Sequence, residues 1–91
     1  MITLKTMAKN AGGKWKTVRA VGWVALDAVT KTGKELRLSQ VGDGGPDYDD
    51  EAVEIYLFTS PEGGTVEANM TIGNSVPDKA VTALIKELLK T

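Results

Sequence analysis

The sequence predicts an α+β fold: a mainly antiparallel sheet of four to five strands with one C-terminal α-helix packed on one face. Two segments, at about 18–41 and 53–72, alternate apolar with polar residues around a short turn, which is the pattern of a β-hairpin. A third segment, at about 76–90, repeats apolar residues at helical spacing. The chain has 91 residues, a length that fits a single domain over 1–91.

Two segments outside the hairpins and the helix have weaker patterns. At the N-terminus, Ile2 and Leu4 indicate a short edge strand, and the glycines within 10–13 indicate a turn or flexible loop. Between the hairpins, 42–52 contains three glycines, a proline and five carboxylates. We expect this second segment to form a long acidic loop.

The hairpin at about 18–41 is predicted from its register. Its turn, 31–33, ends in a glycine, which suits the left-handed position of a three-residue connection. The apolar spacing over 15–29 also fits a helix, but Gly22, the β-branched valines and the coherent register favour a continuous strand there. The register sets Ala28 opposite Leu36, Leu26 opposite Leu38, Val24 opposite Gln40 and, on the other face, Asp27 opposite Arg37.

The hairpin at about 53–72 has the clearest alternation of the chain. A four-residue turn, 61–64, pairs Ser60 with Thr65, and all apolar partners then fall on one face. A slip of one residue would move this apolar set into water, so the register is well specified. It sets Leu57 opposite Ala68, Ile55 opposite Met70 and Val53 opposite Ile72, with Val66 in the same apolar row.

The C-terminal helix is predicted with its start signal. Ser75 is placed as the N-cap, Pro77 suits the first turn, and Asp78 follows three residues after the serine as in a capping box. Basic residues near the end complement the helix dipole. The apolar stripe consists of Val81, Leu84, Ile85 and Leu88, and it requires a sheet face to pack on.

The composition excludes several classes of function. The chain has no cysteine and no histidine, so it lacks a thiol nucleophile, the usual zinc ligand and the usual acid–base catalyst. It also contains no phosphate-binding loop and no nucleophile-elbow motif. We therefore expect no enzymatic activity, no cofactor and no bound metal.

The chain shows no targeting signal. Met1 is followed directly by 2–5, without the basic and then apolar regions of a signal peptide. The most apolar stretch, 18–29, includes Arg19 and Asp27 and is too short to cross a bilayer. These observations predict a cytoplasmic protein with no membrane partner.

The charges are divided between the two halves of the chain. Residues 1–41 contain eight basic and two acidic residues, a net charge of +6, whereas 42–91 contain three basic and ten acidic residues, a net charge of −7. The split indicates a dipolar domain with surfaces for oppositely charged partners. The simpler interpretation is that strands and loops carry solubilising charges.

The function that we favour from sequence is a small non-catalytic protein-binding module, of the kind that phages and mobile elements encode to engage or inhibit a larger host complex. Tyr56 and Phe58 lie on the polar face of the strand predicted at the start of 53–72. They would form a protein-binding patch or a dimer interface, unless the N-terminal arm covers them as a second core layer. The acidic loop would meet a cationic surface, although a solvated loop or a cation site are alternatives. The partner-binding candidates are Asp47, Asp49, Asp50, Glu51, Tyr56 and Phe58.

The alternative function is a nucleic-acid-binding domain that uses the basic, aromatic N-terminal half. Lysines would contact phosphates and tryptophans would stack on bases. In a continuous strand, Trp15, Arg19 and Trp23 share the face opposite Val24 and Leu26. The net charge of −1 and the lack of a known RNA-binding motif argue against it. The nucleic-acid candidates are Lys14, Trp15, Lys16, Arg19, Trp23, Lys31, Lys34 and Arg37.

A third expectation is a homodimer, which would form through the opposite charges of the two halves or through free sheet edges.

Overall fold

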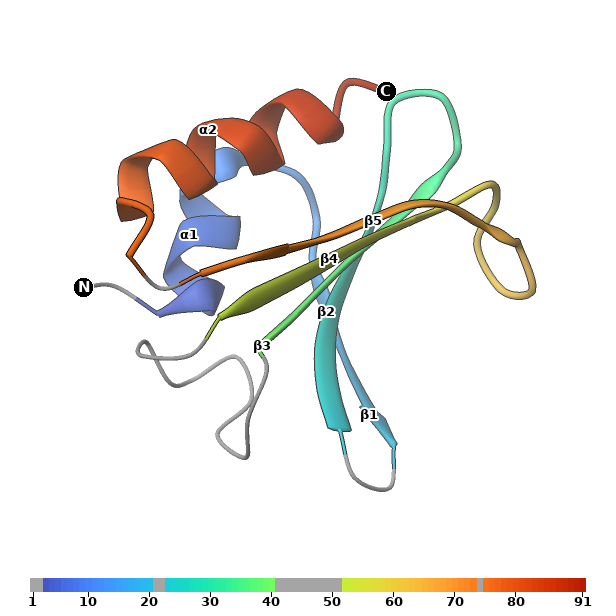
Figure 1. The fold of residues 1–91 in the computed structure, drawn as a ribbon. Coiled ribbons are helices and arrows are strands. Elements are labelled where there is room, and N and C mark those ends of the chain that lie inside the picture. Colours follow the sequence, from blue (N-terminus) through green and yellow to red (C-terminus); the bar gives the residue numbers. More distant parts are fainter. Residues whose placement is uncertain (1–2, 21–22, 41–51, 74) are drawn as a thin grey trace.

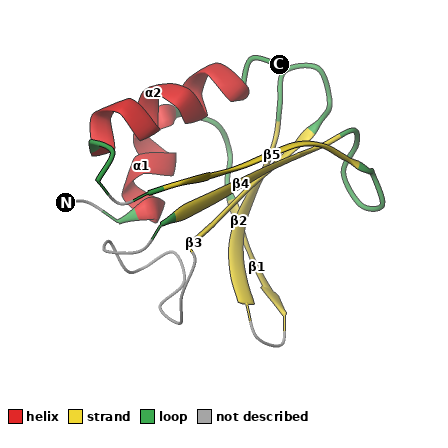
Figure 2. Ribbon diagram, in the orientation of Figure 1, coloured by secondary structure: helices red, strands yellow, loops and turns green. Residues whose placement is uncertain are grey.

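The computed structural model describes residues 3–20, 23–40, 52–73 and 75–91. It contains a five-stranded antiparallel sheet with two helices, which confirms the predicted α+β class (Figure 1). Both helices lie on the same side of the sheet (Figure 2). Within the described residues, neither helix has the length and apolar character needed to span a membrane. The elements are α1 (Leu4–Ala11), β1 (Lys16–Ala20), β2 (Trp23–Val29), β3 (Glu35–Gln40), β4 (Val53–Phe58), β5 (Val66–Ile72) and α2 (Asp78–Leu88).

The sheet is a meander, because each strand pairs with the strand that follows it in the chain. The predicted hairpin registers are confirmed, and Gly33 has the left-handed backbone (φ 89°) that the β2–β3 turn requires. The predicted pair of Val24 with Gln40 continues the same register by one residue beyond Ala25 and Ser39. The confirmed pairs are Leu26 with Leu38, Asp27 with Arg37, Ala28 with Leu36, Val53 with Ile72, Ile55 with Met70 and Leu57 with Ala68.

The prediction of one continuous strand up to Val29 is wrong. The chain reverses between Ala20 and Trp23, so that β1 and β2 form a hairpin of their own. Arg19 lies opposite Val24, and directly opposed residues of antiparallel strands share a face. The expected placement of Arg19 on the face away from Val24 is therefore also wrong. The two-residue connection shifts the alternation by one residue, so Arg19 and Val24 share a face although they are five residues apart in the chain.

The predicted N-terminal edge strand is replaced by a helix. The Thr3 hydroxyl oxygen accepts a hydrogen bond from the Thr6 backbone N–H (3.2 Å) and caps the start of α1. Gly12, with φ 90°, ends the helix. Ile2 lies outside the described residues. The buried face of α1 has the spacing of an amphipathic helix and consists of Leu4, Met7, Ala8 and Ala11.

The C-terminal helix begins later than predicted. Pro77, with an extended backbone (ψ 141°), occupies the N-cap position, and its carbonyl accepts hydrogen bonds from two first-turn N–H groups. Ser75 therefore does not cap α2, and Asp78 is its first residue, where a carboxylate complements the helix dipole. The apolar stripe is confirmed, because Val81 and Ile85 are buried.

The hydrophobic core lies between the sheet and the two helices, and α1 and α2 also contact each other. Leu36, Leu38 and Ile85 have no exposed surface. Helix packing covers the central strands, whereas β5 is exposed over most of its length. The buried core residues of the described chain are Leu4, Met7, Ala8, Ala11, Leu26, Leu36, Leu38, Val53, Ile55, Leu57, Val81 and Ile85.

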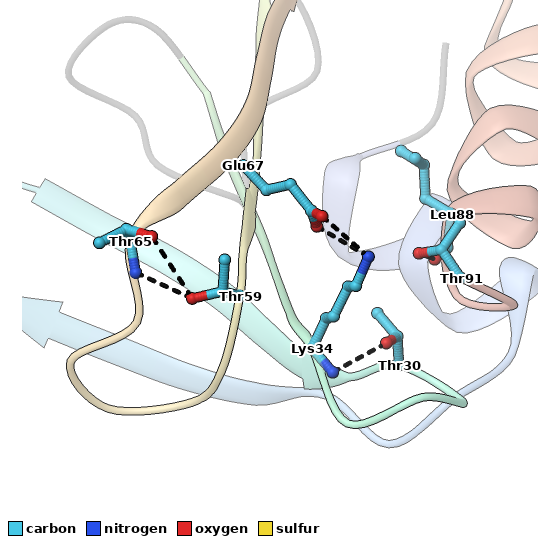
Figure 3. A network of polar contacts seen from close by, with 7 residues as sticks. All are labelled: Thr30, Lys34, Thr59, Thr65, Glu67, Leu88 and Thr91. Carbon is cyan, nitrogen blue, oxygen red and sulfur yellow. Dashed lines mark hydrogen bonds and ion pairs between the residues drawn. The ribbon is translucent and has the colours of Figure 1, made fainter.

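The β2–β3 turn is held to the C-terminus and to β5. The Lys31 N–H donates to the Leu89 carbonyl (2.8 Å), and the Thr32 N–H donates to the Thr91 carbonyl (3.1 Å). At the end of the turn, the Lys34 ammonium binds the Glu67 carboxylate in β5 (2.8 Å; Figure 3). These contacts connect three parts of the chain at one end of the sheet.

A β-bulge changes the predicted hairpin near its turn. Phe58 lies opposite Val66 instead of Glu67, so one extra residue is accommodated in β5. Val66 was expected in the apolar row on the core face, but it lines a hollow on the opposite face together with Phe58. The Thr59 N–H donates to the Thr65 carbonyl (2.9 Å), which places Thr65 beside Thr59 rather than Ser60 as predicted.

Candidate functional site

The sheet face opposite α1 and α2, which we call the helix-free face, carries two adjoining hollows. The larger has a volume of about 430 Å³ and the smaller of about 270 Å³, and Arg37 and Phe58 line both. The larger hollow is completed by Ala25, Ser39, Glu54, Tyr56 and Val66, and the smaller by Lys16, Val18, Asp27, Glu35, Glu62, Gly63 and Gly64.

An aromatic pair forms one side of the larger hollow. The rings of Tyr56 and Phe58 stack with their centroids 6.2 Å apart and an interplanar angle of 23°. The Arg37 guanidinium carbon lies 5.3 Å from the centre of the Phe58 ring, within the range of a cation–π interaction. Both aromatic side chains are half-buried. The N-terminal helix α1 packs on the other side of the sheet, so it does not cover this pair as a second core layer.

Tyr56 is oriented by its neighbour on the same strand. Its hydroxyl donates a hydrogen bond to the Glu54 carboxylate (3.2 Å). The negative charge of Glu54 and this hydrogen bond raise the pKa of the Tyr56 hydroxyl, which therefore keeps its proton. The ring consequently presents a neutral, mostly apolar surface to the hollow.

The ion pair of Asp27 with Arg37 lies beside the hollows, with Arg37 lining both and Asp27 lining the smaller one. Asp27 is only 2% exposed, and its two carboxylate oxygens accept hydrogen bonds from Nε (2.8 Å) and Nη2 (2.9 Å) of Arg37. This bidentate geometry fixes the guanidinium plane over Phe58. The hydrogen bond to Asp27 raises the pKa of Arg37, so the guanidinium keeps its positive charge. The predicted cross-strand charge pair is thus confirmed, and it also positions the cation–π contact.

Glu35 is the second buried carboxyl of the smaller hollow, at 7% exposure. Burial raises the pKa of Glu35, and the charge of Asp27 raises it further, whereas Arg37 and Lys16 act in the opposite direction. Glu35 was not predictable as a site residue from the sequence, because it lies opposite Val29 in the register and approaches Asp27 only diagonally across the strand pair.

The raised pKa of Glu35 predicts a pH-dependent stability. The folded protein binds the Glu35 proton more tightly than the unfolded chain does. The stability that this proton contributes is therefore fully present at pH values below the pKa of Glu35 in the unfolded chain. It is lost as the pH rises through the pKa of Glu35 in the folded protein. Replacing Glu35 with glutamine should therefore stabilise the protein above that pKa and have little effect below it. Urea unfolding of wild type and Glu35→Gln across pH 4 to 8 measures this difference. The exposed Glu62→Gln, in the same hollow, is the control, and equal behaviour of the two variants would contradict the assignment.

Two cations proposed for nucleic-acid contact are already paired with carboxylates. Arg37 binds Asp27, and Lys34 binds Glu67. The tryptophan proposed to stack on bases, Trp15, is half-buried against the core, and its indole N–H donates to the Gly12 carbonyl (2.8 Å). Trp15 thus packs partly against the core and also lines two surface hollows.

The remaining nucleic-acid candidates do not form one continuous groove in the described part of the chain. Lys14 and Lys16 share a hollow of about 230 Å³ with Trp15, but Asp27 and Glu35 line it as well. Lys31 is exposed in the β2–β3 turn, and Arg19 is exposed on the edge strand β1. Trp23 lies opposite Ala20 in the register.

Four partner-binding candidates, Asp47, Asp49, Asp50 and Glu51, lie outside the described residues. Their segment follows Gln40 at the end of β3 and precedes Val53 at the start of β4. Among the described residues, no three acidic side chains gather closely enough to hold a metal ion. Sequence analysis missed Ser39 and Val66 as site residues, since a solvent-face serine and a bulge-displaced valine have no distinguishing local pattern.

Comparison of the chain with models of protein families, with curated proteins and with solved structures gives no match. The function must therefore be argued from the chemistry of the helix-free face.

Proposed function

We propose that this protein is a non-catalytic binding module that holds a segment of a protein partner on its helix-free face. The observation that carries the proposal is the cluster of Tyr56, Phe58 and Arg37 around the larger hollow. Tyrosine and arginine are enriched among residues that dominate binding energy in protein interfaces, and they act best when their positions are fixed beforehand. The Glu54 hydrogen bond and the Asp27 ion pair fix them in this way.

The lining of the larger hollow favours an apolar side chain as the anchor of the partner. The rings of Tyr56 and Phe58 and the side chain of Val66 form its apolar part. The charge of Arg37 is already neutralised by Asp27, so the hollow does not attract a free anion strongly. Ser39 and Glu54 supply hydrogen-bonding groups for the partner's main chain at the rim.

The acidic residues within β4 and in the chain segment before it favour a partner with basic residues next to its anchor. Glu54 lies in the hollow itself, on β4. The segment that joins β3 to β4 adds Asp47, Asp49, Asp50 and Glu51 to the chain just before this strand. We therefore assign the partner's apolar anchor to Tyr56 and Phe58, and its flanking cations to these carboxylates.

The proposal is tested with fluorescein-labelled, lysine-rich peptides that carry one central leucine or tryptophan. Binding is measured by anisotropy, and the site is located by NMR chemical-shift changes on the protein. Tyr56→Ala and Phe58→Ala should each weaken binding about tenfold or more, which corresponds to about 1.4 kcal/mol or more. Val29→Ala is the matched control, because this valine is 60% exposed and lines neither of the two hollows.

The contribution of the acidic segment is tested separately. Reversing two charges, Asp49→Lys with Asp50→Lys, should weaken binding of the lysine-rich peptides and reduce its dependence on salt. A peptide with alanine at its centre should bind much more weakly than the leucine peptide. Binding that is unaffected by both aromatic substitutions and by charge reversal would show that the helix-free face is not the binding surface. Salt-sensitive binding of single-stranded oligonucleotides at Lys14 and Lys16 would instead favour the nucleic-acid function.

A further inference from the structure

The strand β5 is an edge of the sheet with an open side. It pairs with β4 only, among the strands that the structure describes, so the backbone groups on its other side have no strand partner there. Six of its seven residues are exposed, and Ile72 alone is partly buried. An edge of this length is a template for another strand, and most proteins protect such edges with charges, prolines or a covering element.

The two edges of the sheet differ in this protection. The opposite edge, β1, is shorter and carries Lys16 and Arg19. The strand β5 has no proline and only one charged residue, Glu67. The Glu67 carboxylate is turned back across the sheet to Lys34, with contacts of 2.8 and 3.0 Å (Figure 3). Its charge is therefore neutralised on the sheet and does not repel a strand that approaches the edge.

Apolar side chains also remain uncovered along β5 on the side that carries the helices. Ala68 and Met70 follow the core face of the register, opposite Leu57 and Ile55, but both are exposed. Met70 is 37% exposed, as is Val76 just beyond the strand. The helices thus leave a strip of the core face open at this edge, and a strand added there would place further side chains beside the strip.

We propose that β5 pairs with β5 of a second copy of this chain, antiparallel about a two-fold axis through Asn69. Asn69 is the middle residue of β5, so this axis centres the pairing on the strand, with Ala68, Asn69 and Met70 in the regular part that follows the bulge. It places Ala68 opposite Met70 of the second copy, which joins the two apolar strips, and it places Glu67 opposite Thr71 of the second copy. No two like charges are opposed. The pairing extends the sheet from five strands to ten and goes beyond the proposed function, because it does not use Tyr56 or Phe58.

The absence of native cysteine allows a direct test by cross-linking. At the two-fold axis, the two Asn69 Cα atoms would be about 4.5–5.5 Å apart, a distance that a disulfide spans. The two Thr71 Cα atoms would be offset by four residues, about 13 Å along the strands, which a disulfide cannot span. Both positions are exposed on the helix-free face. Asn69→Cys should therefore form a disulfide-linked dimer in a glutathione buffer about tenfold faster than Thr71→Cys.

The mass in solution is measured in parallel by sedimentation equilibrium from micromolar to near-millimolar concentration. Wild type should move from 9.7 kDa toward twice that mass, and Met70→Lys should shift this change to higher concentration. Val29→Lys, which adds the same charge at an exposed position of β2, should behave as wild type. A monomer at all concentrations, or equal cross-linking at positions 69 and 71, would overturn the proposal. The Tyr56 and Phe58 variants should dimerise normally, so failure of this pairing is distinguishable from failure of the proposed function.

Discussion

Replacing Leu38 by alanine is expected to remove a large share of the stability of the fold. Leu38 has no exposed surface and sits on the central strand β3, between Leu26 and Ile55. Truncation of a buried leucine costs about 2–5 kcal/mol, because apolar contact is lost and a cavity remains. A domain of this size has a free energy of unfolding of about 5–14 kcal/mol. The melting temperature should consequently fall by about 10 °C or more.

Thermal and urea unfolding, followed by circular dichroism, measure this loss. The control is Val29→Ala, which removes apolar atoms at a position that is 60% exposed and should change the free energy of unfolding by less than about 0.5 kcal/mol. A loss at position 38 as small as that of the control would mean that the layer between the sheet and the helices is not the main core.

Replacing Arg37 by methionine is the second change with a large expected effect. Methionine keeps most of the length of the side chain, but it leaves the Asp27 carboxylate buried without its bidentate partner. Breaking a fully buried ion pair costs about 3–5 kcal/mol, and since Arg37 is 26% exposed we expect about 2–3 kcal/mol. The stacking of Tyr56 on Phe58 should also become less ordered, because the guanidinium no longer covers the Phe58 ring.

The cause of this loss is tested by adding Asp27→Asn to Arg37→Met. If the cost arises from an unpaired buried charge, the double variant should be more stable than Arg37→Met alone, as measured by urea unfolding. A double variant that is less stable, by the sum of the two single losses, would show that the two side chains contribute independently. The aromatic order is followed by near-ultraviolet circular dichroism.

Hairpin registers were predictable from the sequence because they follow from strict alternation and turn length. The pairs of Leu26 with Leu38 and of Ile55 with Met70 are found as predicted, and so is the ion pair of Asp27 with Arg37. These features depend on residues close together in the chain. The period of two specifies them without any knowledge of the rest of the fold.

The errors arose where a second structure fits the same residues. The Thr3 cap and the buried positions 4, 7, 8 and 11 specify α1, but the glycines that end this helix also indicate a loop. The reversal after Ala20 and the bulge beside Phe58 each shift the alternation by one residue, which moves Arg19 and Val66 to the other face. The position of Glu35 in the candidate site depends on four strands coming together, which local patterns do not contain.

The meander order of the sheet has a consequence for how the protein folds. Every strand pairs with the next strand along the chain, and the longest connection, between Gln40 and Val53, has twelve residues, so each pairing loses little chain entropy compared with a contact between the chain ends. The contact between α1 and α2 is different, because it joins residues near opposite ends of the sequence. The sheet can therefore assemble by successive hairpins before the helical layer closes over it.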